Sequence, residues 1–530
     1  MSRSLSRSIA ATLLVLGVVG AWLGFANPLY HLPVAVLLFP AGLFAAACAA
    51  PTVRRAWRRG LLAATAAYGG CLYWVAIPPH DYGGMAWYLA APCPVLLAFY
   101  LALYPALFCV LVRLAAPALP RIALALFAGA AWGALEWLRG VLFTGFPWLT
   151  LPSAFVPWPE MIQAASIMGS LGLAALLAAI ACLATASLRG DVSLPGALLA
   201  MALFAALAAH GRDALDRAIP ETGSVQVRLV QGNIDQGRKW EPAYQQGTVN
   251  RYLTLSAQKT DAPRPELIVW PETAMPFYFQ EINDMSRAVR NAAHQLDAML
   301  VVGAPGYRFG TRPGVYEYFN RAFLVGKDGV NEGVYDKEHL VPFGEYVPYG
   351  EYLTFIQKLT AGVGDFSPGA ETAPLVPGAR SGHGAGDIAL GTLICYETIF
   401  PELAQKRVAD GANVLLNISN DAWFGRTAAP VQHLHLTALR AVEQGKYLIR
   451  ATNTGISAII DPRGRILAHT GLFRAQVLDA RVGLVAQSTL YHRIAPAVPW
   501  VLAGLTLLGL AWAGLTGRAG LDVSDPRNTL

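Results

Sequence analysis

The chain has 530 residues, of which 55% are hydrophobic and only 14% are charged, and its formal net charge is +6. This composition, with a mean hydropathy of +0.41, excludes an ordinary soluble protein and is typical of a membrane protein with an extramembrane domain. The positive charge does not indicate nucleic-acid binding, because the basic residues form no stripe interleaved with aromatic residues.

Eight apolar segments have about the length of a membrane-spanning helix, which is roughly 20 residues. They cover residues 8–26, 32–50, 60–77, 86–112, 122–137, 163–188, 194–209 and 494–515. We therefore predict seven membrane helices in residues 1–210, a polar domain in residues 211–492, and an eighth membrane helix with a tail in residues 493–530. A signal peptide is the alternative for the first segment, but its length and the lack of a clear small-x-small cleavage site favour a retained helix.

The arginines that flank these segments predict the orientation of the chain. A cytoplasmic N-terminus leaves only Arg139 in the short outer loops, whereas the inner segments contain Arg3, Arg7, Arg54, Arg55, Arg58, Arg59, Arg113, Arg121, Arg189, Arg518 and Arg527. This asymmetry follows the positive-inside rule. Seven membrane crossings then place the polar domain on the outer side of the membrane, and the eighth returns the C-terminus to the cytoplasm.

The polar domain alternates short apolar runs with more helical, charged stretches. We predict strands at residues 225–231, 266–270, 300–303, 321–325, 388–394, 414–418 and 456–460. Predicted helices cover residues 243–259, 282–295, 401–410 and 431–447. Strands separated by helices indicate a layered α/β domain.

Three segments of the polar domain end in groups that can carry chemistry. Glu272 follows an apolar strand, Lys337 precedes a turn-rich loop, and Cys395 ends the predicted strand at residues 388–394. The other five cysteines lie in long apolar runs, so Cys395 has no disulfide partner in its own domain. A lone cysteine is commonly just a small buried hydrophobic residue, but the carboxylate and the ammonium at the other two segment ends favour a reactive thiol.

These three side chains form a set that acyl-transfer chemistry can use. Glu272 can take the thiol proton while Cys395 attacks a carbonyl, and can then return the proton to the leaving group. Lys337 favours the thiolate and, with a backbone N–H near Cys395 or Tyr396, can hold the tetrahedral oxyanion. One such donor contributes about 3–4 kcal/mol, or roughly 10²–10³ in rate. The first step would leave a thioester on Cys395.

The sequence around these residues resembles the nitrilase, or carbon–nitrogen hydrolase, superfamily with its Glu–Lys–Cys triad. The resemblance rests on WPE ending at Glu272, on KEHLVPFGEYVP starting at Lys337, and on CYE starting at Cys395. The membrane segments narrow it to the apolipoprotein N-acyltransferase family, the membrane-embedded branch found in the bacterial inner membrane. Further similar segments are VQGNI at residues 230–234 with Lys239-Trp240, NISNDAWFG at 417–425, RATNTG at 450–455, EWLRG at 136–140 and GFPW at 145–148.

This resemblance implies a fold and an activity. The implied fold is an α-helical transmembrane bundle of about eight helices that carries an α/β nitrilase-like αββα sandwich domain. The sandwich domain would be periplasmic, and both chain termini would be cytoplasmic. The implied reaction moves the sn-1 acyl chain of a phospholipid, through a cysteine thioester, to the N-terminal amino group of the S-diacylglyceryl-cysteine of an apolipoprotein. No metal and no soluble cofactor is expected, because the thioester stores the acyl group.

The resemblance also implies a role for each matching residue. Glu272 would be the base, Lys337 the cation that holds the oxyanion, and Cys395 the nucleophile. Glu345, eight residues after Lys337, would be an accessory carboxylate that orients the site. The residues that would help to position substrate are Trp240, Tyr396 and Glu397.

Two other functional classes stay open. A membrane-tethered amidase or nitrilase would use the same triad to hydrolyse a C–N bond, but a soluble substrate needs no lipid-accessible base of eight helices. The second alternative is a transporter or a lipoprotein-binding scaffold with an inactive domain. The complete triad and the lack of a midplane run of ionisable residues in the predicted spans argue against it.

Three further features have both a structural and a functional interpretation. The aromatic-rich segment at residues 343–359 fits an ordinary loop or a mobile arm over a lipid entrance equally well. His433-Leu434-His435 resembles part of a metal site, but a helical pattern without further ligands favours a structural role. For Glu136 and Arg139, at the end of a membrane segment, an ion pair is favoured over contact with a lipid headgroup.

Overall fold

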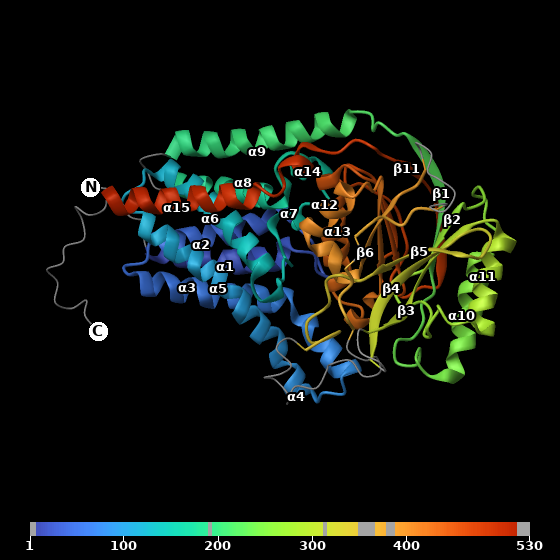
Figure 1. Cartoon of the computed structure of the whole chain (residues 1–530). Helices are drawn as coiled ribbons and strands as arrows, with labels where there is room; N and C mark the ends of the chain where they lie inside the picture. The colour runs from blue at the N-terminus through green and yellow to red at the C-terminus, as the bar shows by residue number, and fades with distance from the viewer. Residues whose placement is uncertain are drawn as a thin grey trace. The chain divides into compact units, whose positions relative to one another are not determined.

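The computed structural model describes residues 7–188, 193–310, 315–347, 366–370, 372–377 and 387–516. The chain divides into two compact units (Figure 1). The first contains Met1–Tyr73, Pro94–Ala214 and Ile494–Leu530, and the second contains Trp74–Cys93 and Leu215–Arg493. The first unit is helical, and the second is a layered α/β domain.

The first unit consists of α-helices joined by short turns. Its longer helices are α1 (Arg7–Gly24), α2 (Leu38–Cys48), α3 (Val53–Cys71), α5 (Pro92–Ala115), α6 (Arg121–Val141), α8 (Ala165–Ser187), α9 (Ser193–Asp216) and α15 (Val498–Thr516). Short helical turns at η1 (Pro33–Leu37), η4 (Leu142–Thr144), α7 (Leu151–Ala154) and η5 (Pro159–Met161) lie between them. Each of the eight predicted spans falls on one of these helices.

Six helices in the described part of the chain are long and apolar enough to cross a membrane, and a bent pair raises this number to seven if it counts as one span. The bent pair joins α3 to the turns at Tyr73–Tyr82, at an angle of 68°. The predicted span at residues 60–77 falls on this pair, and the one at residues 32–50 falls on a shorter apolar helix, Pro33–Cys48. The other six predicted spans coincide with the six qualifying helices, so the structure has several candidate membrane spans where the sequence predicts them.

Small residues bring α1 close to its neighbours. A Cβ atom added at Gly42 of α2 would lie 2.4 Å from the carbonyl oxygen of Leu13, and one added at Gly20 would lie 2.5 Å from that of Ala35. Both distances are well inside van der Waals contact, so only glycine fits. Close backbone approach through small residues is the usual way in which membrane helices associate.

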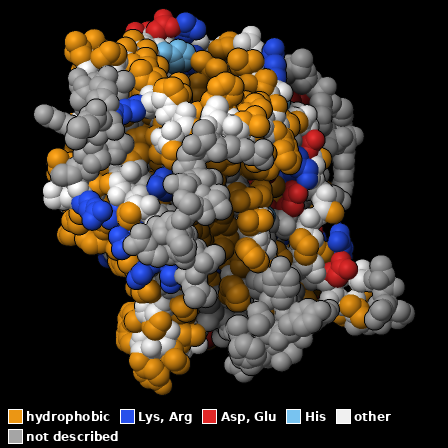
Figure 2. Space-filling model, turned by 90° about the vertical axis from the view of Figure 1, so that its left-hand side faces the viewer, with side chains coloured by type: hydrophobic (Ala, Val, Ile, Leu, Met, Phe, Trp, Pro, Cys, Tyr) orange, Lys and Arg blue, Asp and Glu red, His pale blue; other side chains and the backbone are white. Residues whose placement is uncertain are grey.

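Large apolar side chains are exposed along the candidate spans. On α15, Leu507, Leu508 and Leu515 are 65%, 69% and 72% exposed. On the face shown in Figure 2, hydrophobic side chains predominate, Lys and Arg lie among them, and Asp and Glu are few. Extended apolar surface of this kind is unfavourable in water and suits contact with lipid.

The second unit contains two open β-sheets. A six-stranded sheet has the order β11-β1-β2-β3-β4-β5, with β1 (Gly223–Gln231), β2 (Leu267–Val269), β3 (Met299–Phe309), β4 (Tyr316–Val325), β5 (Asn331–Asp336) and β11 (Gln476–Leu484). A five-stranded sheet has the order β10-β9-β8-β7-β6, with β6 (Leu390–Ile394), β7 (Val414–Ser419), β8 (Leu448–Thr452), β9 (Ala458–Ile460) and β10 (Ile466–His469). The pairs β1–β2, β2–β3, β6–β7 and β7–β8 are parallel.

The two sheets pack face to face, and helices cover their outer faces (Figure 1). One core cluster joins inward-facing residues of both sheets, such as Val227 and Leu416. A second cluster lies between the six-stranded sheet and two helices, α10 (Pro242–Ser256) and α11 (Asp284–Leu296). The helices α12 (Pro401–Ala409) and α13 (Ala429–Gln444) lie on the side of the five-stranded sheet. The predicted αββα sandwich is therefore confirmed.

Local signals explain where several of these helices begin and end. Proline occupies the first turn of α10, α12 and α13, where its missing N–H costs no hydrogen bond. Asn283 caps α11, because its side chain accepts from the backbone N–H of Ser286 at 2.8 Å and the Ser286 hydroxyl accepts from the backbone N–H of Asn283. Gly445 ends α13 with a φ of +65°.

All seven predicted strands and all four predicted helices of this domain are present, with bounds that shift by a few residues. Four strands were not predicted: β5, β8, β10 and β11. β11 is a long strand whose first half is only partly buried, and in β10 exposed and partly buried residues alternate. β8 begins four residues after α13 and contains Arg450, which hides its strand character.

The segment Trp74–Cys93 groups with the α/β unit, although it falls within the predicted membrane region of residues 1–210. Trp74 Nε1 donates to Gln432 Oε1 at 3.1 Å, and the Tyr82 hydroxyl donates to the carbonyl of Ala422 at 2.9 Å. The Tyr82 ring also meets the Trp423 ring edge-on at 4.8 Å. The chain between α3 and α5 therefore packs on α13 and on the loop that follows β7.

Candidate active site

Three turns that follow strands carry the predicted catalytic residues. Glu272 lies three residues after β2, Lys337 directly follows β5, and Cys395 directly follows β6. Their exposed fractions are only 6%, 1% and 7%. Buried charges must be paired, so the contacts of these side chains decide what the site can do.

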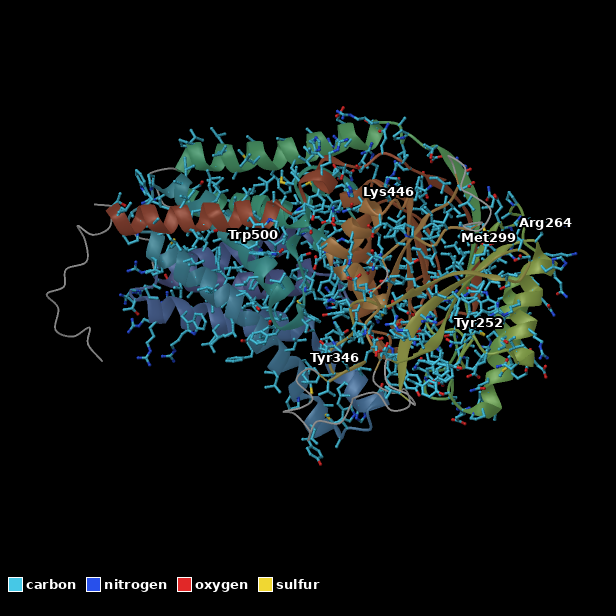
Figure 3. The ribbon with its side chains drawn as sticks, in the orientation of Figure 1. Tyr252, Arg264, Met299, Tyr346, Lys446 and Trp500 are labelled. Atoms are coloured by element: carbon cyan, nitrogen blue, oxygen red, sulfur yellow. The ribbon has the colours of Figure 1, made fainter. Side chains whose placement is uncertain are left out.

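Packing on the six-stranded sheet holds the Glu272 turn in place. Trp270, two residues before Glu272, stacks on Tyr252 of α10 at 5.1 Å and donates to the hydroxyl of Ser256 at 2.9 Å. Tyr252 is labelled in Figure 3, where its side chain lies between α10 and the sheet. A Cβ atom at Gly303 of β3 would lie 2.2 Å from the carbonyl oxygen of Pro271, so the turn rests directly on the β3 backbone.

The ammonium of Lys337 connects two carboxylates. Its Nζ lies 2.9 Å from Oε1 of Glu345 and 3.4 Å from Oε1 of Glu272. Asn320 of β4 donates to the same two oxygens, at 2.9 Å and 2.6 Å. The second oxygen of Glu272, Oε2, is buried and has no hydrogen-bond partner in the part of the chain that the structure describes. Glu272 thus has one anchored oxygen and one that can receive a proton.

These charges act on the Cys395 thiol. Burial, with Glu272 and Asp421, raises the pKa of the thiol, while Lys337 and Ser419 oppose the rise. Burial also opposes the charge of Lys337, but Glu345, Glu272 and Cys395 raise the pKa of its ammonium above the ordinary value. Lys337 favours the thiolate, but the net effect of burial and the nearby charges is a raised thiol pKa. The thiol is therefore protonated at rest, and a base must remove its proton when the sulfur attacks.

The backbone of Cys395 is strained. Its φ is +52°, in the left-handed region that residues other than glycine seldom adopt. It opens the short helical turn η6 (Cys395–Ile399) directly at the end of β6. Strain of this kind persists only where the surrounding contacts hold it, and it is often found at functional sites.

Glu397 connects the Cys395 turn to the Lys337 turn. It is fully buried, and its carboxylate accepts hydrogen bonds of 2.6–3.0 Å from the backbone N–H groups of Ile394, Glu338 and His339 and from the hydroxyl of Tyr335. Both of its oxygens are therefore occupied by the chain. The structure places Glu397 beneath the site, where it holds the two turns together.

The other predicted residues lie around the same turns. The Tyr396 ring is 93% buried and packs edge-on against Phe400 at 5.1 Å. The Trp240 ring is half-buried, with Nζ of Lys239 6.0 Å from its centroid. Lys239 in turn donates to the hydroxyl of Thr273, the residue after Glu272, at 2.8 Å. Burial lowers the pKa of Lys239 to about 7.

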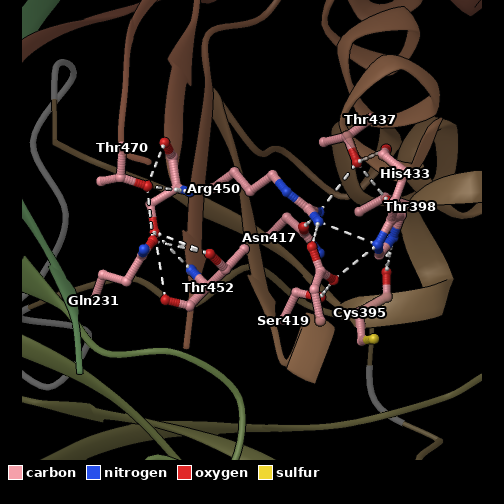
Figure 4. A network of polar contacts seen from close by, with 12 residues as sticks. Gln231, Cys395, Thr398, Asn417, Ser419, His433, Thr437, Arg450, Thr452 and Thr470 are labelled. Atoms are coloured by element: carbon pink, nitrogen blue, oxygen red, sulfur yellow. Dashed lines mark hydrogen bonds and ion pairs between the residues drawn. The ribbon is translucent and has the colours of Figure 1, made fainter. Parts of the chain in front are cut away.

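A buried polar network lies behind Cys395 (Figure 4). Arg450 of β8 donates to Asp421 at 2.8 Å, and His433 of α13 lies 3.1 Å from both of them. The other ring nitrogen of His433 lies 3.2 Å from the carbonyl oxygen of Cys395. In Figure 4 the sulfur of Cys395 points away from this network. The network therefore contacts the carbonyl of Cys395 through His433, and its members Asp421 and Ser419 also act on the thiol.

The sequence matches known families over most of its length. Residues 226–488 match the carbon-nitrogen hydrolase family, and residues 19–183 match the apolipoprotein N-acyltransferase N-terminal domain. The chain is 40% identical over 463 residues to an apolipoprotein N-acyltransferase from Geobacter metallireducens, with 86% of each chain covered. It is 36% identical to one from Bordetella bronchiseptica, over 88% of this chain and 90% of that one. The chain belongs to the apolipoprotein N-acyltransferase family.

Among solved structures, the chain is similar to Nit3 of Saccharomyces cerevisiae, a member of branch 10 of the nitrilase superfamily. The match covers 59% of this chain and 99% of that one, at 18% identity and a TM-score of 0.37. This likeness is too weak to add to the family assignment, which rests on the relatives at 36–40% identity.

Several residues of the site were not predicted from the sequence. Asn320 bridges Glu272 and Glu345 from the middle of an apolar strand, and a lone amide in such a strand was the available signal. His433 was interpreted as structural, and the structure places it against the Cys395 carbonyl. Both contacts join segments that are far apart in the sequence, which a single sequence does not reveal.

The structure also describes three other features that the sequence analysis considered. Within the described residues, no group of three His, Cys, Asp or Glu side chains is arranged to hold a metal ion. Glu136 accepts from Trp132 Nε1 at 2.9 Å and Arg139 donates to the Tyr68 hydroxyl at 3.2 Å, and all four side chains line one small pocket within the helical unit of this N-acyltransferase. Of the predicted aromatic arm, Phe343 and Tyr346 are described, whereas Tyr349, Tyr352 and Phe355 lie outside the described residues.

Proposed function

We propose that this member of the apolipoprotein N-acyltransferase family transfers a fatty acyl chain from a phospholipid to the N-terminal amino group of an S-diacylglyceryl-cysteine apolipoprotein, through a thioester on Cys395. The observation that supports the proposal is the difference between the two carboxylate oxygens of Glu272. One oxygen is held by Lys337 and Asn320, the other is buried without a partner among the described residues, and the carboxylate acts electrostatically on the Cys395 thiol.

The first half-reaction forms the thioester. Oε2 of Glu272 takes the thiol proton as the sulfur attacks the sn-1 ester carbonyl of the phospholipid. The ammonium of Lys337 and a backbone N–H of the Cys395–Tyr396 turn hold the negative oxygen of the tetrahedral intermediate. When the C–O bond breaks, protonated Glu272 gives its proton to the alkoxide, and a lysophospholipid leaves.

The second half-reaction uses the same groups in reverse. The α-amino group of the apolipoprotein attacks the thioester carbonyl as a free amine, which forms readily near neutral pH because α-amino groups have pKa values of about 8. Glu272 takes the proton that the nitrogen loses, and returns it to the sulfur as the C–S bond breaks. An amide and the resting thiol result, so neither a redox partner nor an energy source is consumed.

The remaining residues fall into two groups. Glu345 and Asn320 keep Lys337 and Glu272 in contact, and Glu397 keeps the Lys337 and Cys395 turns together, so we assign these residues to positioning. Trp240 follows Lys239, which bonds to Thr273 beside Glu272, and Tyr396 follows the nucleophile, so we assign these two residues to contact with substrate.

The proposed substrates also indicate where the catalytic domain lies in the cell. Both substrates are lipid-anchored, so the thiol must reach the membrane surface on which they meet. We propose that the domain at residues 211–492 is periplasmic, that residues 1–210 and 493–530 supply the inner-membrane helices, and that both termini are cytoplasmic. The support is the arginine distribution, with Arg54, Arg55 and Arg58 exposed at the start of α3.

Intact-mass spectrometry tests the proposal directly. Purified protein mixed with phospholipid should gain the mass of one acyl chain, and peptide mapping should place it on Cys395. Adding a diacylated peptide with a free N-terminal cysteine should remove the adduct and acylate the peptide. Cys395→Ala should gain nothing, whereas Cys93→Ala, in a half-buried cysteine of the membrane region, should behave as the wild type.

Two results would contradict the proposal. A wild-type protein without an adduct under single-turnover conditions removes the thioester route. An adduct that water discharges equally fast with and without the amine acceptor indicates a hydrolase of the amidase or nitrilase type instead.

A further inference from the structure

His433 of α13 makes direct contact with the backbone of the proposed nucleophile (Figure 4). It is only 1% exposed, and its Nε2 lies 3.2 Å from the carbonyl oxygen of Cys395. The same nitrogen lies 3.3 Å from the hydroxyl of Thr398, which also belongs to the turn η6. The histidine therefore faces the turn that Cys395 opens.

The neighbours of the second ring nitrogen determine which nitrogen carries the proton. Nδ1 lies 3.1 Å from Nη2 of Arg450 and 3.1 Å from Oδ1 of Asp421. Arginine can only donate, so a hydrogen bond from Arg450 requires a lone pair on Nδ1. The contact on the other side of the ring is decisive: a carbonyl oxygen can only accept, so a hydrogen bond between Nε2 and the carbonyl of Cys395 needs the hydrogen on Nε2.

The ring is uncharged near neutral pH. Burial, and then the Arg450 guanidinium, lower the pKa of His433, while Asp421 and the carbonyl of Cys395 oppose the shift. A neutral imidazole that bonds to a carbonyl oxygen through Nε2 has its hydrogen on that nitrogen. That hydrogen points at the carbonyl oxygen of Cys395, so the contact is a hydrogen bond that His433 donates.

This hydrogen bond orients the whole peptide between Cys395 and Tyr396, including its N–H group. Cys395 has a φ of +52°, which costs free energy unless contacts hold it. In a trans peptide the C=O and the following N–H point in opposite directions, so holding the carbonyl of Cys395 also sets the direction of the Tyr396 N–H. A hydrogen bond to the carbonyl also polarises the peptide and strengthens its N–H as a donor.

We propose that His433 is a positioning residue for acyl transfer, which orients the Cys395–Tyr396 peptide by donating a hydrogen bond from Nε2 to the carbonyl oxygen of Cys395. This inference rests on the proposed function, because it assigns that peptide to the oxyanion site. His433 would then contribute to catalysis without direct contact with substrate. Arg450 and Asp421 contribute by fixing the ring in the donating form.

Two substitutions at this position separate the donor from the rest of the network. His433→Gln puts an amide N–H near the place of Nε2, so it can still donate to Cys395. His433→Asn keeps a polar group only near the place of Nδ1, where it faces Arg450 and Asp421. We expect the rate of acyl-adduct formation to stay within about fivefold of wild type in the Gln variant and to fall roughly 50-fold or more in the Asn variant.

A second measurement distinguishes this role from a general loss of structure. Alkylation of Cys395 by iodoacetamide needs the thiol but no oxyanion donor, so its rate should stay within about twofold of wild type in both variants. His435→Gln makes the same replacement two residues along the same helix, and its adduct rate should match that of wild type. Wild type and Cys395→Ala, measured in parallel, report separately whether the thioester route itself holds.

Several outcomes would overturn the inference. Equal adduct rates in the two variants show that the donor to Cys395 does not matter, and a slower Gln variant shows that the contacts of Nδ1 matter instead. An alkylation rate that falls in step with the adduct rate places the effect on the thiol or on folding. If the Asn variant does not fold, the Gln variant decides alone: a 50-fold loss of adduct formation in a folded protein rejects the proposal.

Discussion

The ammonium of Lys337 lies 3.4 Å from Oε1 of Glu272, and this contact connects the turn after β5 to the turn after β2. Since it occupies only one oxygen of Glu272, the other stays available for a proton. A second carboxylate, that of Glu345, lies 2.9 Å from the same ammonium and helps to keep it charged. Lys337 can therefore remain a cation throughout the reaction while Glu272 gains and loses a proton.

Glu272→Gln should separate the acidity of the thiol from its use in acyl transfer. Glu272 raises the pKa of Cys395, so the thiol of this variant should lose its proton at a lower pH than in wild type. Acyl-adduct formation should still fall at least about 100-fold, because no group remains to move the proton. The pH dependence of iodoacetamide alkylation and intact-mass spectrometry measure the two effects. A higher alkylation pKa, or an adduct rate near that of wild type, contradicts the assignment of Glu272.

Lys337→Met should slow acyl-adduct formation by roughly 10²–10³, the usual effect of losing one oxyanion donor. The pKa of Cys395 should rise further, since Lys337 is the cation that lowers it. The variant also leaves two buried carboxylates without their cation, which should cost about 3–5 kcal/mol in unfolding free energy. Lys327→Met is the matched control, because its ion pair with Asp297 is exposed and should change stability by about 0.5 kcal/mol or less.

Glu397→Gln tests whether Glu397 acts through the two catalytic turns. The amide replaces one acceptor oxygen with a donor that faces backbone N–H groups, so we expect a loss of about 2–4 kcal/mol in unfolding free energy. Adduct formation should fall together with thermal stability. Glu317→Gln, in the exposed pair with Arg308, should leave both almost unchanged. A stable Glu397→Gln protein that has lost only activity would instead indicate direct contact with substrate.

Lys239→Met should change how stability depends on pH. Burial lowers the pKa of Lys239 to about 7 from an unfolded value near 10.4. Below pH 7 the lysine is charged in both states, whereas between about pH 7 and 10 only the unfolded state keeps the proton. Raising the pH across this window should therefore stabilise wild type relative to the variant, by about 1.4 kcal/mol per pH unit. Thermal unfolding at pH 6, 7, 8 and 9 measures this difference.

The exposed Lys259 supplies the control for this measurement. Lys259→Met should follow the wild-type curve at every pH. A constant offset between wild type and Lys239→Met from pH 6 to pH 9 would mean that Lys239 titrates outside this range, and that only its hydrogen bond to Thr273 contributes.

Much of the fold could be predicted because its signals are local. Runs of about 20 apolar residues mark the membrane helices, since a bilayer selects for length and hydropathy alone. Alternation of strands and helices marked the α/β domain. β11 escaped prediction because its pairing with β1 joins residues more than 240 positions apart, and half of its side chains are only partly buried. The bend after α3 was missed for a similar reason: Trp74 bonds to α13 and Tyr82 to the loop after β7, both far along the chain.

The sequence by itself determined which chemical groups are available: a thiol, a base and a cation, each at the end of a strand, in a chain with membrane-spanning helices. Only the tertiary structure decided how these groups act on one another. In the fold, one oxygen of Glu272 has no partner among the described residues, and both oxygens of Glu397 accept hydrogen bonds from the backbone. His433 lies against the carbonyl of Cys395. The physical reason is that burial and charge coupling depend on distances across the fold, and parallel strands bring together turns that lie far apart along the chain.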